Sequence, residues 1–185
     1  MRVQLLAAVG LSIAGIALGW TIAKAQQPRQ VPSVTSETVS SESPLATLDW
    51  IVGDWASEGG DRAIEFNCHF TKNRAFLVRS FKNDSASDSQ LSGMQVIAWD
   101  PKKSSIRSWT FDSDGGFGED TWSQTGNRYT IRATYTLPDG GTASAVNVFT
   151  FVDSDRCTWK SVSREIDGEL QPDTDEIVLV RKTSN

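Results

Sequence analysis

The chain has one histidine, His69, and only two cysteines, Cys68 and Cys157, among its 185 residues. It therefore lacks the closely spaced clusters of histidine, cysteine and acidic residues that bind metal ions. It also lacks a set of nucleophile, histidine and acid, and a glycine-rich phosphate loop. The 18 basic and 23 acidic residues are scattered without long runs, so no basic stripe is present. These absences argue against nucleic acid as a partner and leave catalysis without support.

The N-terminus has the features of a targeting segment. Arg2 supplies a positive charge, residues 5–22 are apolar, and Ala23-Lys24-Ala25 places small residues where signal peptidase reads them. The sequence predicts a signal peptide over residues 1–25 and an exported protein, periplasmic or secreted. The alternative is an uncleaved membrane anchor, because the apolar run approaches the ~20 residues that span a bilayer.

Residues 26–44 are dominated by Ser, Thr, Pro and Gln and contain almost nothing to bury. Such a composition does not offset the entropy lost on ordering. We expect a disordered linker here, followed by a single folded domain over residues 45–185.

The folded part begins with a short helix and continues as strands. Leu45, Leu48, Ile51 and Val52 have helical spacing, and Gly53 ends the helix. Beyond it, apolar and polar residues alternate between turns rich in Gly, Asn, Asp and Pro, a pattern typical of antiparallel hairpins. The ten predicted strands are residues 53–55, 62–71, 75–82, 90–100, 105–112, 118–124, 128–137, 142–152, 156–165 and 176–182.

A meander of ten strands leaves two unpaired edges unless the sheet closes on itself. A sandwich would need longer crossovers than the turns of this chain provide. The sequence therefore predicts an all-β fold, a single up-and-down antiparallel β-barrel with a short N-terminal helix.

Two stretches resemble a known family. Residues 48–55, LDWIVGDW, look like the opening of calycin (lipocalin-like) barrels, in which a short helix precedes a G-x-W at the first strand. Residues 99–119 contain W-D-P and F-D-S-D-G-G-F-G-E. They are similar to nitrobindin-like proteins and to bacterial lipocalin-like domains of unknown function, including the module found after SnoaL-like domains in exported proteins. The resemblance covers residues 45–182.

The resemblance implies structural roles for three residues. Gly53 and Trp55 match the G-x-W, and Arg181 matches the last-strand arginine that packs on this tryptophan and closes the barrel. Haem-binding relatives use a histidine on the iron, but His69 lies on the polar face of its strand, which should point outward. We therefore predict no cofactor and disfavour haem binding through His69.

The two cysteines allow a disulfide in an exported protein. In a closed meander, however, the strands of Cys68 and Cys157 are separated by two others, whereas a bridge needs Cα atoms within about 7 Å. We expect two buried free thiols.

Polar residues on otherwise apolar strand faces are the best functional lead. If those faces are interior, two guanidinium groups and two amides project among aromatic rings, where they would bind an anionic group while the rings cover an apolar body. In the alternative, the arginines face outward or pair with acids. The candidate ligand-binding residues are Arg79, Gln95, Trp99, Arg107, Trp109, Phe111 and Asn147.

The acidic stretch 112–116, DSDGG, lacks the spacing of a calcium loop and is better explained as a turn with glycine at positive φ. Glu119 and Asp120 are neighbours on a strand and should point to opposite faces, so they do not make an acid/base pair.

Three interpretations of function remain. The first is an exported barrel that binds a small apolar or amphipathic molecule. The second is an accessory module whose barrel is filled by its own side chains. The third is an enzyme, or a haem-binding protein, using the cavity. A membrane is a partner only if the N-terminal segment is uncleaved, and the sequence specifies neither the ligand nor the oligomeric state.

Overall fold

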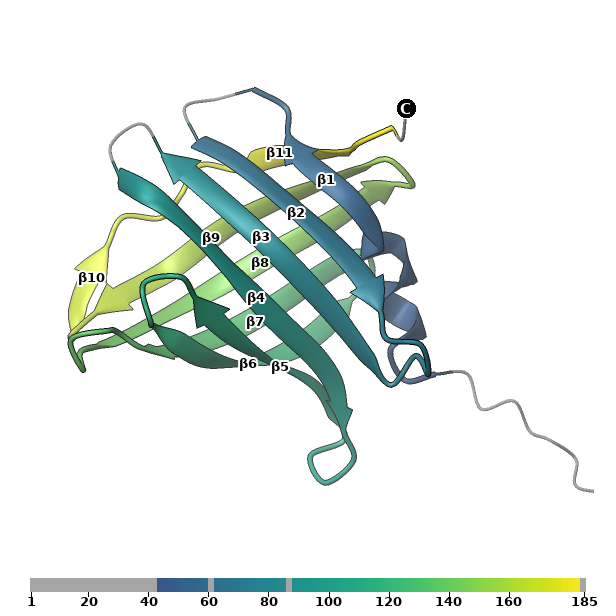
Figure 1. Cartoon of the computed structure of the whole chain (residues 1–185), viewed down its shortest axis with the longest axis horizontal. Coiled ribbons are helices and arrows are strands. Elements are labelled where there is room, and N and C mark those ends of the chain that lie inside the picture. The colour runs from purple at the N-terminus through teal and green to yellow at the C-terminus, as the bar shows by residue number, and fades with distance from the viewer. Residues whose placement is uncertain (1–42, 60–61, 86–87, 184–185) are drawn as a thin grey trace, which may run out of the picture. The chain divides into compact units, whose positions relative to one another are not determined.

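The structure is a computed structural model that describes residues 43–59, 62–85 and 88–183. It is an all-β fold in which ten antiparallel strands close into a barrel (Figure 1). From β1 to β9 each strand pairs with the next in sequence, β9 pairs with the last strand β11, and the ring closes where β11 pairs with β1, with Arg181 opposite Trp55. The predicted fold class is confirmed.

One short helix and eleven strands make up the described part of the chain. Strands β1 to β9 and β11 form the ring, and β10 pairs only with β9 on the outside. The elements are η1 (Ala46–Ile51), β1 (Gly53–Ser57), β2 (Arg62–Phe70), β3 (Phe76–Ser85), β4 (Asp88–Asp100), β5 (Ser105–Asp112), β6 (Phe117–Thr125), β7 (Arg128–Thr136), β8 (Thr142–Asp153), β9 (Arg156–Ile166), β10 (Glu169–Gln171) and β11 (Ile177–Arg181).

The sequence did not predict β10, and it predicted a loop where part of one hairpin forms. β10 has three residues, and its Leu170 is 82% exposed, so it carries no alternation of buried and exposed positions. Residues 83–89 are polar, which predicts a loop, but β3 continues to Ser85 and pairs there with Asp88 of β4. Backbone pairing extends this hairpin although its residues have little to bury.

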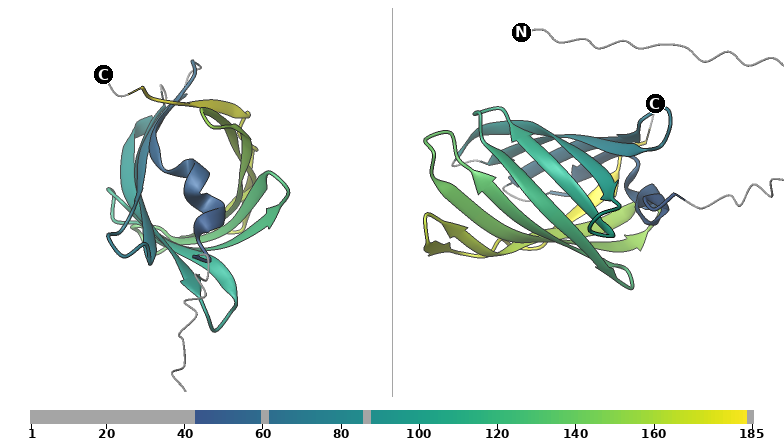
Figure 2. Two further views of the ribbon diagram at one scale, coloured as in Figure 1. Left: turned by 90° about the vertical axis from the view of Figure 1, so that its right-hand side faces the viewer. Right: turned by 90° about the horizontal axis from the view of Figure 1, so that it is seen from below.

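The predicted short helix is present as a 3-10 helix, and it lies across one end of the barrel (Figure 2). Leu45, Leu48 and Ile51 are three residues apart, which is the period of a 3-10 helix, and all three are buried. Gly53 follows with φ of 121°, a conformation that only glycine adopts readily, and so turns the chain from η1 into β1.

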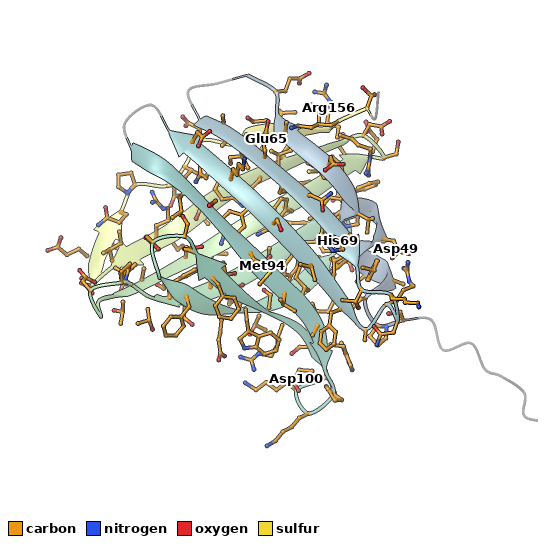
Figure 3. All side chains as sticks on the ribbon, viewed as in Figure 1. Asp49, Glu65, His69, Met94, Asp100 and Arg156 are labelled. Carbon is orange, nitrogen blue, oxygen red and sulfur yellow. The ribbon has the colours of Figure 1, made fainter. Side chains whose placement is uncertain are left out.

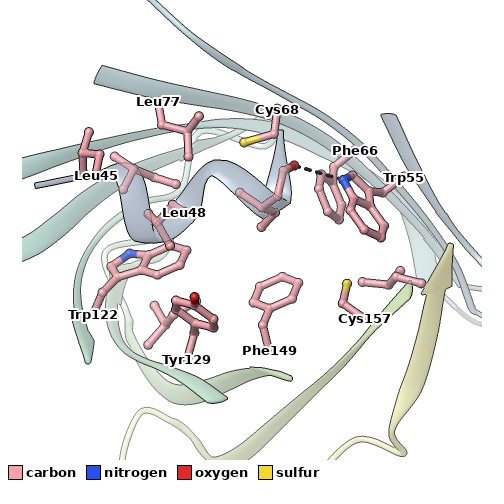
Figure 4. Close-up of a cluster of buried hydrophobic side chains, with 14 residues drawn as sticks. Leu45, Leu48, Trp55, Phe66, Cys68, Leu77, Trp122, Tyr129, Phe149 and Cys157 are labelled. Atoms are coloured by element: carbon pink, nitrogen blue, oxygen red, sulfur yellow. Dashed lines mark hydrogen bonds between the residues drawn. The ribbon is translucent and has the colours of Figure 1, made fainter. Parts of the chain in front are cut away.

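Beneath η1, apolar side chains from most of the strands fill the barrel (Figure 4). Trp55 is fully buried, stacks on Phe66 with ring centroids 6.0 Å apart, and donates a hydrogen bond from its indole nitrogen to the carbonyl of Ile51 at 2.9 Å. Because this cluster packs against η1, the interior at that end is solid.

The N-terminal predictions fall mostly outside the described residues. This applies to the signal peptide over 1–25 and to all but the last two residues of the linker over 26–44. Within the described ranges, no helix has the length and apolar character needed to cross a bilayer.

Candidate functional site

Beyond the apolar cluster, the barrel contains a cavity of about 160 Å³. Strand alternation turns its residues inward: Arg79 is the register partner of Gln95, Gln95 of Thr110, and Ile131 of Asn147. The lining combines aromatic and aliphatic side chains with a few polar groups. It comprises Ile64, Phe66, Arg79, Phe81, Lys82, Asn83, Gln95, Thr110, Asp120, Ile131, Tyr135, Asn147, Phe149, Trp159 and Leu179.

Arg79 is the cationic group of this cavity. Its guanidinium carbon lies 5.6 Å from the ring centre of Phe66, 5.9 Å from Phe81 and 5.5 Å from Phe149. It forms no hydrogen bond or ion pair with any residue that the structure describes, and its Nε is buried. Burial lowers the pKa of Arg79 below its ordinary value, but an arginine keeps its charge in a protein. The buried guanidinium of Arg79 therefore lacks the ion-pair or hydrogen-bond partner that normally offsets the cost of removing a charge from water.

Asp120 is the anionic group of the same cavity and is only 2% exposed. Its Oδ2 accepts hydrogen bonds from Gln95 Nε2 at 2.8 Å, from Ser108 Oγ at 2.6 Å and from Thr110 Oγ1 at 3.3 Å. Burial raises the pKa of the Asp120 carboxyl, and these hydrogen bonds and the charge of Arg79 act against that rise. No ion pair joins Asp120 to Arg79 among the described residues, so the two charges share a cavity without contact.

Other polar atoms around the cavity also lack partners. Gln95 Oε1 and Asn83 Oδ1 are buried acceptors that receive no hydrogen bond from the described part of the chain. Tyr135 also lines the cavity, and burial together with the charge of Asp120 raises its pKa to about 12, so its hydroxyl stays protonated. The cavity therefore presents one buried cation, Arg79, and several acceptors to whatever occupies it, and the exposed Lys82 also lines it.

Three of the seven predicted ligand-binding residues, Arg79, Gln95 and Asn147, line this cavity. Trp99 lies at the end of β4, is 38% exposed and does not line it.

The expected interior placement of Arg107, Trp109 and Phe111 is wrong. On β5 the buried residues are Ser108 and Thr110, so the alternating positions face outward. Arg107 forms ion pairs on the outer surface with Asp100, at 3.6 Å, and with Glu119. The interior site does not include these residues.

The error on β5 has a physical cause. Its inward residues are small and polar because they form hydrogen bonds with Asp120, while its aromatic residues cover the outside. A hydrophobicity pattern assigns such a strand to the wrong face. Because of the same inversion, the sequence did not predict Asp120 as a site residue. It did predict that Glu119 and Asp120 point to opposite faces, and Glu119 is exposed whereas Asp120 is buried.

Several other expectations can be compared with the structure. His69 is exposed on the outer side of β2, as predicted, and its ring nitrogen Nδ1 lies 3.1 Å from Asn67 Oδ1 (Figure 3). Cys68 and Cys157 are free and buried, as predicted, and burial raises the pKa of each thiol to about 12. The stretch 112–116 forms a turn, with Gly115 at φ of 97°.

The structure places Arg181 over Trp55, with the guanidinium carbon 4.4 Å from the indole ring centre. Arg181 also donates hydrogen bonds to the carbonyls of Trp50, Val52 and Ser154. A β-carbon added at Gly53 would collide with its guanidinium, so glycine is needed for this contact as well as for the turn. This is the arrangement that the lipocalin-like resemblance implies.

No protein-family model matches the chain, and no curated protein gives a significant match. The fold and the site define a closed antiparallel β-barrel with a small internal cavity that contains charged groups.

Proposed function

We propose that the barrel binds a small molecule with an apolar body and an anionic group, and that Arg79 holds the anion. The observation that carries the proposal is the guanidinium of Arg79, which lines an aromatic cavity and has no hydrogen-bond or ion-pair partner among the described residues. A carboxylate supplies the charge and the acceptor oxygens that a guanidinium fork lacks here.

The rings around Arg79 suit the rest of such a ligand. Phe66, Phe81, Phe149 and Trp159 are the aromatic hydrocarbon surfaces among the lining residues. Burying apolar surface against them contributes about 25 cal/mol per Å², while Arg79 fixes the orientation.

The volume of the cavity limits the ligand to roughly one ring. At about 160 Å³ it resembles an engineered cavity of about 150 Å³ in another protein that takes up benzene. It falls below the ~300–1,000 Å³ of sites for drug-sized ligands. A porphyrin or a long acyl chain exceeds this space, which supports a ligand other than haem.

The proposal includes the export and the lipocalin-like relationship that the sequence predicts. The apolar segment and the Ala23-Lys24-Ala25 site support export to the periplasm or medium, with residues 45–185 as the binding domain. The closed barrel and the Trp55–Arg181 contact support a lipocalin-like relationship.

A second candidate function is supported by the outer surface. Met94, Phe111 and Phe117 are 43%, 50% and 52% exposed on β4, β5 and β6. Phe111 is the register partner of both others, so the three side chains form one apolar patch. Such a patch is typical of contact with another macromolecule and favours an accessory module acting through its surface.

A titration of the full-length chain tests the cavity proposal. Phenylacetate, a single ring with a carboxylate, is added while tryptophan fluorescence is recorded, because Trp159 lines the site. We expect saturable binding that weakens about tenfold or more in Arg79→Met, since a hydrogen bond to a charged group contributes about 1.5–3 kcal/mol.

The matched control is Arg107→Met, which removes an arginine from the outer face. It should bind phenylacetate like the wild type. Equal affinity in all three proteins would show that Arg79 does not hold the anion.

A further inference from the structure

Next to Arg79, the cavity wall carries two acceptor oxygens that have no donor. One is the buried Oε1 of Gln95. The other is Oδ1 of Asp120, because every hydrogen bond that the described residues donate to this carboxylate reaches Oδ2. The two side chains are joined at 2.8 Å through Gln95 Nε2, so their free oxygens belong to one acceptor group.

This acceptor group is adjacent to the cation. Arg79 and Gln95 are directly opposite each other on β3 and β4, and such partners have β-carbons about 4.5–5.5 Å apart. A ligand whose anion lies on Arg79 therefore has its neighbouring atoms beside Gln95 and Asp120. A donor on those atoms satisfies both oxygens, of which Gln95 Oε1 is buried without a partner.

The charges of the cavity favour a cationic donor. A ligand carboxylate neutralises Arg79 and leaves the carboxylate of Asp120 buried close to a second negative charge. Burial already disfavours the charged form of Asp120. An ammonium group on the ligand offsets that charge, and its three hydrogens suit the acceptors of Gln95 and Asp120.

We infer that the ligand is a small α-amino acid with an apolar side chain, bound through its carboxylate to Arg79 and through its ammonium group to Asp120 and Gln95. The inference rests on the proposed function, because it assigns the second polar group of the same ligand. The aromatic rings that line the cavity then pack against the side chain of the amino acid ligand. The volume of the cavity limits that side chain to about one ring or a branched aliphatic group.

Three compounds of one shape test this assignment on the full-length chain at neutral pH. Phenylacetate, mandelate and phenylglycine share the ring and the carboxylate, and they carry hydrogen, hydroxyl and ammonium on the α-carbon. We expect phenylglycine to bind at least about tenfold more tightly than the other two, because a buried pair of opposite charges contributes strongly to affinity.

Asp120→Asn removes the charge and keeps the shape of the side chain. In this variant phenylglycine should lose its advantage, while phenylacetate binds as tightly as before or more tightly. Circular dichroism shows whether the variant is folded. If the variant does not fold, the affinities of the wild type for the three compounds still test whether the site prefers an ammonium group.

The outcomes separate this inference from the proposed function. If mandelate binds as tightly as phenylglycine, the cationic donor is wrong. If all three compounds bind equally and Arg79→Met weakens each of them, the amino acid assignment fails while the anion site stands. If the wild type binds none of them, both fail.

Discussion

The side chains of Arg79, Asp112 and Asp120 show how strand alternation puts charge into the interior of a small barrel. Asp112 shares a strand face with Ser108 and Thr110, and its Oδ1 is buried with no partner among the described residues. Burial, and after it the nearby charges of Asp114 and Asp120, raise the pKa of Asp112 to about 6. Each of these buried charges carries a cost in stability, which a bound ligand of opposite charge offsets and which protonation removes for the two carboxylates.

Asp112 should make stability depend on pH. Because its pKa is raised on folding, the folded state binds the proton more tightly than the unfolded chain, and stability falls as pH rises from about 4 to about 6. Asp112→Asn removes this penalty, so the variant should be more stable than the wild type above pH 6, by up to about 3 kcal/mol. Urea denaturation at pH 4 and pH 7 measures the difference.

The control for this change is Asp139→Asn, in the exposed turn between β7 and β8. The gain of Asp112→Asn should be small near pH 4, where the wild-type carboxyl is almost fully protonated in the folded state and about half protonated in the unfolded chain. A gain of the same size at both pH values would mean that its cause is not the buried charge.

Only some residues of the candidate site could be predicted from the sequence. Arg79, Gln95 and Asn147 interrupt apolar faces, and strand alternation then places them inside. Asp120 could not be found in this way, because its hydrogen-bond donors Ser108 and Thr110 come from a strand with an inverted pattern. Knowledge of strand register was needed, since Ser108 is the register partner of Asp120.

At the scale of elements, alternation and turn residues predicted every strand of the ring, because each has one face in the core and one in solvent. The short strand β10 and the extended β3–β4 hairpin depend on backbone pairing alone and have no such pattern. The helix η1 was predicted from four apolar residues, but its 3-10 form depends on packing across the barrel end.

The contacts of Arg181 hold η1 to the last strand. This side chain bonds the carbonyls of Trp50 and Val52 at the end of η1 and lies over Trp55. Arg181→Ala removes a cation–π contact and leaves these carbonyls without their donor, at a cost of about 1–3 kcal/mol. We expect the melting temperature to fall by roughly 2–10 °C.

Arg156→Ala provides the comparison for this prediction. Arg156 forms an exposed ion pair with Glu58, and such pairs contribute about 0–1 kcal/mol. If the Arg181→Ala variant melts at the wild-type temperature, Arg181 does not stabilise the closed barrel.

At the largest scale, the barrel that the structure describes has two unequal parts. The end beneath η1 is packed with Trp55, Phe66 and their neighbours, whereas the cavity beyond it contains Arg79 and Asp120 without contact between them. A barrel that served only as a scaffold would gain stability from an apolar filling in place of these charges. Their presence is the reason to expect a ligand.

Native mass spectrometry of the protein purified from its own source tests that claim most directly. The account predicts a reproducible extra mass of a small, single-ring or smaller compound on the wild type and on Arg107→Met, and the bare protein mass for Arg79→Met. A bare mass for all three proteins, with no binding of added phenylacetate or phenylglycine, would contradict the account and favour a barrel that acts through its outer surface.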